Sequence, residues 1–142
     1  MKDIVHAILI PAPPEVIYPL VSTAAGLGRW WAEDVWETDG AVDLGFFSRQ
    51  TVYRFRMQRK RPPLDIEWKC ETPGEWLDTR LIFRMESASD GTLVRFVHAD
   101  WSAETDYFTI CNTSWGELMY RLKSAARGEP RGPLFLRDGM AV

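Results

Sequence analysis

The stretch from Asp106 to Arg127 has the pattern of one long helix with a single apolar face. Its apolar residues recur every three or four positions, which is the period of one side of a helix. They are Phe108, Cys111, Trp115, Leu118, Leu122 and Ala125, with Met119 widening the stripe. Ser102 or Thr105 can cap its start, and Gly128 with Pro130 predicts its end. A helix of about 20 residues is about 30 Å long, so it needs an apolar surface of that length to cover.

The preceding chain predicts such a surface, because its apolar residues alternate as they do in β-strands. Ile4 to Ile10 predicts a first strand, and short helices are expected at Glu15–Val21 and Leu27–Ala32. Alternating segments then follow at 42–46, 53–58, 64–70, 80–85 and 92–100. Their short connections and single polar faces favour an antiparallel sheet with one solvated side. We therefore expect an α+β fold, in which a curved antiparallel sheet of about six strands wraps around the long C-terminal helix.

Length and charge set limits on the protein's class. The chain has 142 residues and a net charge of −3, so we expect one domain spanning 1–142 and no nucleic-acid partner. No apolar run approaches the ~20 residues of a membrane span, and the N-terminus has no signal-peptide pattern, so we expect a cytoplasmic protein. Arg54, Arg56, Arg59, Lys60 and Arg61 form a basic edge, which Asp65 and Glu67 are expected to neutralise.

Metal, cofactor and nucleophile signals are absent from the sequence. Only His6 and His98 are present, and no His, Cys or Asp cluster has metal-ligand spacing. No glycine-rich phosphate loop follows a strand, and no serine lies in a nucleophile elbow. Cys70 and Cys111 are expected to be reduced and packed. We therefore expect neither a metal ion nor a cofactor.

The aromatic content, 13% with seven tryptophans, suggests a roomy or ligand-facing interior. If the helix does not close fully on the sheet, an apolar cavity remains between them, which is a usual small-molecule site. Core filling is the alternative for each inward residue. The residues expected to face such a cavity are Tyr53, Phe55, Trp68, Leu81, Phe83, Phe96, His98, Phe108, Cys111, Trp115 and Met119, with Trp30 and Trp31 as a wall or lid.

His98 is the most specific candidate, because alternation with Val94 and Phe96 points its imidazole toward the apolar side. A buried histidine tends to be neutral, and it can bind a ligand or act as a base near neutral pH. The alternative is a core histidine satisfied by a tyrosine or a backbone carbonyl. Tyr53, Tyr107 and Asp100 are the partners within expected reach, and a Tyr–His–Asp set would polarise a carbonyl.

Several motifs together resemble the START-like superfamily, and within it the family named after the activator of the heat-shock protein 90 ATPase. These motifs are Ile8-x-Ile10-x-Ala12-Pro13-x-Glu15-x-Ile17, Leu27-x-Arg29-Trp30-Trp31, Gly91-Thr92-x-Val94-x-Phe96-x-His98 and Cys111-Asn112-x-x-Trp115-x-x-Leu118-x-x-Leu122. The resemblance covers nearly the whole chain and implies a helix-grip fold with two short helices after the first strand. Where many relatives carry a Gly-Gly pair, this chain has Gly45-Phe46-Phe47, so two phenylalanines are expected to reshape the cavity mouth.

Three functions stay open at this point. The first is the binding of a hydrophobic or aromatic small molecule, lipid- or polyketide-like, without chemical change. The second is a polyketide-cyclase-type enzyme that uses His98 as an acid or base. The third is a co-chaperone-like or toxin–antitoxin-like interaction domain, with a homodimer or another protein as partner, acting through the exposed sheet face or the tail, in which 134–136 folds back onto the body.

Overall fold

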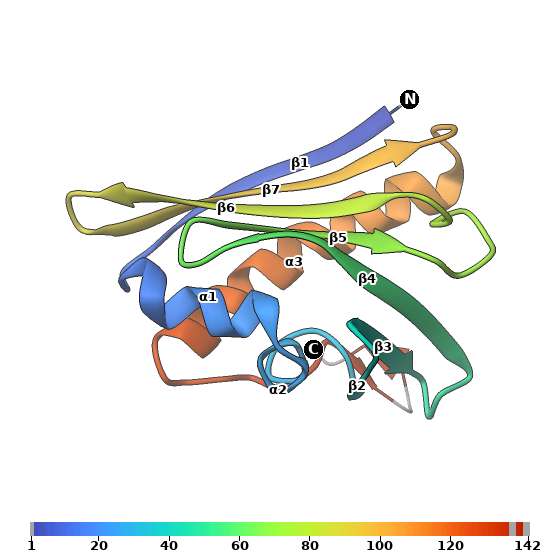
Figure 1. The fold of residues 1–142 in the computed structure, drawn as a ribbon, viewed down its shortest axis with the longest axis horizontal. Helices are drawn as coiled ribbons and strands as arrows, with labels where there is room; N and C mark the ends of the chain where they lie inside the picture. Colours follow the sequence, from blue (N-terminus) through green and yellow to red (C-terminus); the bar gives the residue numbers. More distant parts are fainter. Residues whose placement is uncertain (1, 137–138, 141–142) are drawn as a thin grey trace.

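The computed structural model describes residues 2–136 and 139–140 and shows a curved antiparallel sheet with a long helix lying across its inner face (Figure 1). The N-terminal elements are β1 (Lys2–Ile10), α1 (Pro14–Ser22), α2 (Ala24–Leu27), β2 (Asp34–Thr38), β3 (Ala41–Phe46) and β4 (Thr51–Arg61). The remaining elements are β5 (Asp65–Cys70), β6 (Arg80–Ala88), β7 (Gly91–Trp101), α3 (Asp106–Ala126), β8 (Phe135–Leu136) and β9 (Gly139–Met140).

The main sheet has seven strands in the order β1-β7-β6-β5-β4-β3-β2, and β8 with β9 forms a separate two-stranded ribbon. Strand β4 joins two parts of the sheet, because its first half pairs with β3 and its second half with β5. Only Phe55 and Arg56 pair with both neighbours, and the pairing shifts between Met57 and Arg59. Figure 1 shows β4 diverging from the long strands, so β3 and β2 curl away from the rest of the sheet.

Helix α3 begins and ends as its sequence predicts. The Thr105 hydroxyl accepts from the Phe108 amide at 3.3 Å and caps the start. Gly128, just beyond the helix, has a positive φ of 81°, which glycine adopts without a steric penalty. The helix lies against β1, where the His6 ring bonds the Asn112 side chain at 2.9 Å. This placement brings α3 close to one edge of the sheet and leaves β3 and β4 at the other.

The predicted helix-grip α+β fold is confirmed, with two differences in detail. The sheet has seven strands rather than about six, because the short, partly exposed β2 lacks a clear alternation. The second short helix was expected at Leu27–Ala32, but it spans Ala24–Leu27. Gly26 permits this position, since a Cβ there would lie 2.0 Å from the Pro19 carbonyl oxygen. Trp30 and Trp31 follow this helix in a buried turn.

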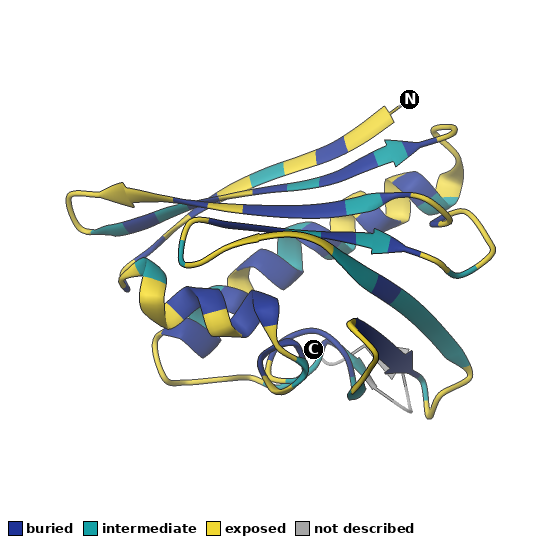
Figure 2. Cartoon of the chain, in the orientation of Figure 1, coloured by how far each residue is buried: buried dark blue, intermediate teal, exposed yellow. Residues whose placement is uncertain are grey.

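Buried and exposed residues alternate along β1 (Figure 2), so the two faces of this strand differ in burial. The inner face and the covering side of α3 are apolar and buried, whereas the outer face carries arginine–carboxylate pairs. Asp65 pairs with Arg61 and Arg59 as expected, but Glu67 pairs with Arg80 at 3.0 Å. Much of the predicted basic edge is therefore neutralised locally. Among the helices in the described part of the chain, none combines the length and apolar character needed to cross a membrane.

Candidate ligand-binding site

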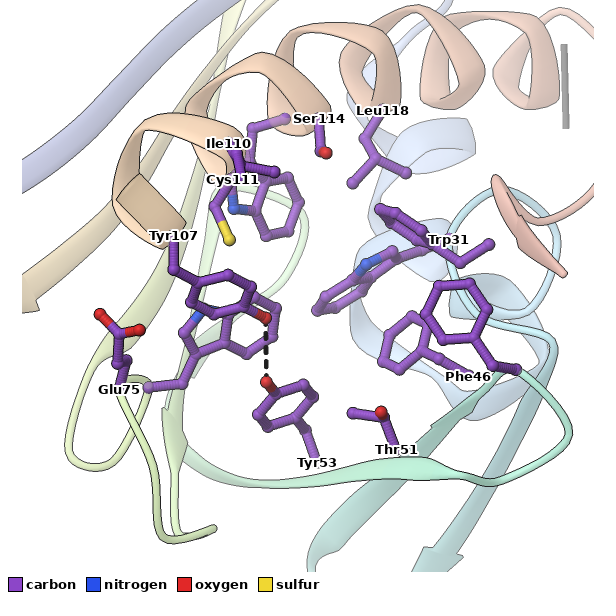
Figure 3. Close-up of a pocket in the computed structure, with 14 residues that line it drawn as sticks. Trp31, Phe46, Thr51, Tyr53, Glu75, Tyr107, Ile110, Cys111, Ser114 and Leu118 are labelled. Atoms are coloured by element: carbon purple, nitrogen blue, oxygen red, sulfur yellow. Dashed lines mark hydrogen bonds between the residues drawn. The ribbon is translucent and has the colours of Figure 1, made fainter. Parts of the chain in front are cut away.

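A cavity of about 540 Å³ opens between the N-terminal half of α3 and the curled sheet edge formed by β3 and β4 (Figure 3). Its position follows from the fold, because α3 packs beside β1 and the opposite edge of the sheet bends away. The loop between β5 and β6 and the C-terminal segment complete the wall. The lining residues are Trp31, Phe46, Phe47, Thr51, Tyr53, Glu75, Trp76, Tyr107, Ile110, Cys111, Ser114, Trp115, Leu118 and Phe135.

Aromatic rings form most of the cavity wall. The Trp31 and Trp115 ring centroids lie 5.0 Å apart, and Tyr53 stacks on Trp76 at 4.1 Å. These rings are held by contacts with one another, so the wall is shaped before any ligand enters. Flat faces of this kind favour offset stacking with another aromatic or conjugated ring.

Two tyrosine hydroxyls provide a polar point inside this aromatic wall. The Tyr53 and Tyr107 oxygens lie 2.9 Å apart and share a hydrogen bond (Figure 3). Burial raises the pKa of both phenols above the ordinary value, so both stay protonated near neutral pH. The pair has two hydroxyl protons, and the mutual bond uses one of them. The second proton can be donated to an acceptor on a ligand.

The other polar lining groups differ in chemistry. Burial raises the pKa of the Cys111 thiol to about 11, which keeps it protonated and a poor nucleophile. Glu75 lies exposed on the β5–β6 loop and accepts a hydrogen bond from the Thr105 hydroxyl at the start of α3. Among the described residues, no cluster of three or more His, Cys, Asp or Glu side chains is arranged to hold a metal ion.

His98 lies behind the cavity wall and is completely buried. The Trp115 indole N–H donates to His98 Nδ1 at 3.1 Å, which places the ring proton on Nε2. Nε2 lies 2.9 Å from the Thr79 hydroxyl, which itself donates to the Trp76 carbonyl at 2.6 Å. Burial lowers the pKa of His98 to about 3. The ring is thus a neutral, fully bonded core histidine, although its partners are Trp115 and Thr79 rather than the tyrosine or backbone carbonyl expected for that alternative.

The expected Tyr–His–Asp set is not assembled. Tyr53 and Tyr107 bond each other, and the His98 partners are Trp115 and Thr79. Asp100 has a positive φ of 70°, which interrupts the alternation of β7, and its carboxylate accepts from Arg80 at 2.7 Å. The strand geometry therefore directs Asp100 away from His98.

Of the residues predicted to face a cavity, the structure brings together Trp31, Tyr53, Cys111 and Trp115. The others lie outside the lining, packed in the core where α1 and α3 close on the sheet: Trp30, Phe55, Trp68, Leu81, Phe83, Phe96, His98, Phe108 and Met119. Trp30 and Trp68, for example, donate their indole N–H groups to the Leu20 and Val21 carbonyls of α1.

Several lining residues were not singled out as ligand contacts from the sequence. Phe46 and Phe47 do line the mouth, where they pack against Phe135 with ring centroids 5.6 and 6.0 Å away. Phe135 belongs to the tail segment expected to fold back onto the body. Trp76 and Glu75 lie in an irregular loop, where no periodicity indicates which way a side chain points.

Comparison with known proteins gives the family. The profile of the family "Activator of Hsp90 ATPase homolog 1-like protein" matches residues 11–127, so the chain belongs to this family. The solution structure of the Aha1 dimer from Colwellia psychrerythraea is 31% identical, with a TM-score of 0.77, covering 89% of this chain and 96% of that one. No match was found among curated proteins.

More distant solved structures share the fold. Protein SSP2350 from Staphylococcus saprophyticus is 15% identical with a TM-score of 0.74, covering 94% of this chain and 98% of that one. CalU16 from Micromonospora echinospora is 18% identical with a TM-score of 0.70, covering 90% of this chain and 76% of that one. At these identities the likeness establishes the helix-grip architecture alone.

Proposed function

We propose that this protein binds a hydrophobic, largely aromatic small molecule in the cavity between α3 and the curled sheet edge. The observation that carries the proposal is a volume of about 540 Å³ walled by aromatic rings, within the range of small-molecule pockets. A cavity of this kind gains binding free energy from burying apolar ligand surface. It also offers one oriented donor, the spare proton of the Tyr53–Tyr107 pair.

The binding test uses two matched probes, 2-acetylnaphthalene and 2-ethylnaphthalene, followed by quenching of tryptophan fluorescence. Trp31, Trp76 and Trp115 line the cavity, so an occupant should change their emission. Both probes are expected to bind, and the ketone more tightly. Replacing both Tyr53 and Tyr107 by Phe should lower the affinity for the ketone by about two- to tenfold, the size of one hydrogen bond, and leave the affinity for the hydrocarbon nearly unchanged. Either single replacement should cost less, because the remaining hydroxyl keeps a proton that it can donate to the ligand.

A second variant tests the location of the site. Ser114 lies in the cavity wall, so the larger side chain of Ser114→Phe should fill the cavity and lower the affinity for both probes by at least tenfold. Thr113→Phe places the same ring one residue earlier, on the exposed side of α3, and serves as the matched control. Equal affinities for both variants, or no quenching in the unaltered protein, would argue against binding in this cavity.

The cyclase-type alternative requires an acid or base that can reach the ligand. Its proposed residue, His98, lies outside the cavity lining and is fully bonded in the core. The two tyrosines remain protonated and suit hydrogen bonding better than proton abstraction. These observations favour holding a ligand over converting it.

We also propose that the protein pairs with a second copy through the β1 edge. The relative from Colwellia psychrerythraea, 31% identical, was solved as a dimer. In this chain β1 is an edge strand whose outer face exposes Val5 (66%) and Leu9 (49%). Light scattering after size-exclusion chromatography should give twice the monomer mass, and the Val5→Glu variant should give a mass closer to that of the monomer. Leu77→Glu, at an exposed loop position, is the control.

A further inference from the structure

The charge at the cavity is one-sided. Among the described residues that line it, Glu75 is the sole charged side chain, and neither lysine nor arginine contributes to the wall. Figure 3 shows the Glu75 carboxylate beside Tyr107, on the side of the cavity where the Tyr53–Tyr107 pair lies. Arg49, in the β3–β4 turn, is paired with Asp34 at 3.2 Å.

The carboxylate is held in place while it stays accessible. The Thr105 hydroxyl donates to Glu75 Oε1, which ties the β5–β6 loop to the start of α3. Thr105 is flanked in the chain by Glu104 and Asp106, so the segment that holds the Glu75 carboxylate carries two further acidic residues. A fixed negative rim attracts a positive group and repels a negative one.

The aromatic wall next to this carboxylate also favours a cation. Trp76 follows Glu75 in sequence and stacks on Tyr53, with their ring centroids 4.1 Å apart. The ring centroid of Tyr107 lies 6.2 Å from that of Trp76. The faces of tryptophan and tyrosine rings carry negative charge density and attract cations. An ammonium group near Glu75 would therefore meet the carboxylate and the ring of Tyr107, which lines the cavity beside it.

We infer that the natural ligand is an amphipathic organic cation, whose aromatic or apolar body fills the cavity while an amine lies at the Glu75 rim. This inference rests on the proposed binding function and assigns its ligand class. The Tyr53–Tyr107 pair then contacts the ligand body inside the cavity, and Glu75 sets the charge preference at its mouth.

Three probes with the same ring system test the inference: 2-naphthylmethylamine, 2-naphthylmethanol and 2-naphthoate, titrated near pH 7. The amine should bind about fivefold more tightly than the alcohol, as expected for one partly solvated charge pair, and the carboxylate more weakly than the alcohol. Raising the salt to about 1 M, where the Debye length is ~3 Å, should shrink the preference.

The Glu75→Gln variant should bring the affinity for the amine to within about twofold of the affinity for the alcohol. Glu15→Gln, which removes the same charge at the start of α1, is the control and should keep the preference. Equal binding of amine and alcohol to the unaltered protein, or a preference that survives Glu75→Gln, would overturn the assigned charge while the binding function stands. Failure of all three probes to bind would overturn both.

Discussion

Trp115 and His98 are joined by an indole N–H to imidazole Nδ1 hydrogen bond of 3.1 Å, sealed between α3 and β7. Both side chains are almost completely buried, so the bond is shielded from water. It fixes the His98 tautomer and, through Nε2, extends to Thr79 and the Trp76 backbone. One side of Trp115 thus belongs to this core network, while the residue also lines the cavity.

Two substitutions of Trp115 separate the contribution of its packing to stability from that of its hydrogen bond. Trp115→Phe keeps most of the ring but leaves His98 Nδ1 unpaired, so unfolding free energy should fall by about 1–3 kcal/mol. Trp115→Ala also opens a void and should cost about 3–5 kcal/mol. Urea unfolding measures both values. A loss below about 1 kcal/mol for the alanine variant would mean that this face of α3 does not pack on the sheet.

The buried neutral state of His98 predicts a pH dependence of stability. The folded-state pKa of about 3 lies below the unfolded value near 6.5, so the unfolded chain binds the proton more readily. The stabilisation is complete above about pH 6.5 and is lost as the pH falls toward about 3, by about 1.4 kcal/mol per unit. Thermal melting between about pH 6.5 and 5, before most carboxylates titrate, reports this slope.

The matched variant for this slope is His98→Asn, which retains an acceptor near Nδ1 and removes the titrating group. It should be less stable at neutral pH and should lose less stability on acidification than the unaltered protein. His6→Asn, on the partly exposed histidine that bonds Asn112, is the control and should keep the slope. If the melting temperature fell with pH equally in His98→Asn and in the unaltered protein, His98 would not be the source of the slope.

Gly26 and Gly28 form a matched pair for testing the close approach of α1 and α2. A Cβ on Gly26 would lie 2.0 Å from the Pro19 carbonyl oxygen, which is backbone and cannot turn aside. Gly28 has an ordinary helical φ of −71°, and a Cβ there would find its nearest atom at 3.6 Å. Gly26→Ala should therefore cost about 3 kcal/mol or more, while Gly28→Ala should be neutral or slightly stabilising. Denaturant unfolding of both variants checks this difference.

The sequence was sufficient for the fold because its strongest periodicities belong to long, half-buried elements. The apolar stripe along α3 and the alternation of apolar and polar residues in β5 and β7 indicate which side of each element is buried. The short strand β2 and helix α2 carry too few residues for a period to emerge, and α2 depends on the contact between Gly26 and Pro19.

The site was harder to predict, because periodicity gives the direction of a side chain but not the distance to the opposite wall. Phe83 and Tyr53 both face inward, yet Phe83 belongs to β6, which α1 contacts, and Tyr53 belongs to the first half of β4, which pairs with β3. Trp76 and Phe135 reach the cavity from irregular segments. Their large aromatic side chains between strands, or beyond the last helix, were the available signal.

The C-terminal segment that carries Phe135 is held by one buried arginine. Arg121 is only 2% exposed, and its guanidinium donates to the carbonyls of Arg131, Gly132 and Pro133 at 3.0–3.3 Å. Leu134 is buried directly after these carbonyls, and Phe135 then closes part of the cavity wall. Arg121 therefore positions this wall without touching the cavity itself.

Arg121→Met should release the segment while preserving the apolar stem of the side chain. Hydrogen exchange of the amides of residues 134–136 should accelerate by at least tenfold, and a bound naphthalene probe should dissociate faster, since the wall opens more often. Arg127→Met, at an exposed position at the end of α3, is the control and should alter neither rate. Unchanged exchange in Arg121→Met would show that Leu134 and Phe135 alone hold the segment. Faster exchange with unchanged probe release would show that the segment is not the route by which a ligand leaves.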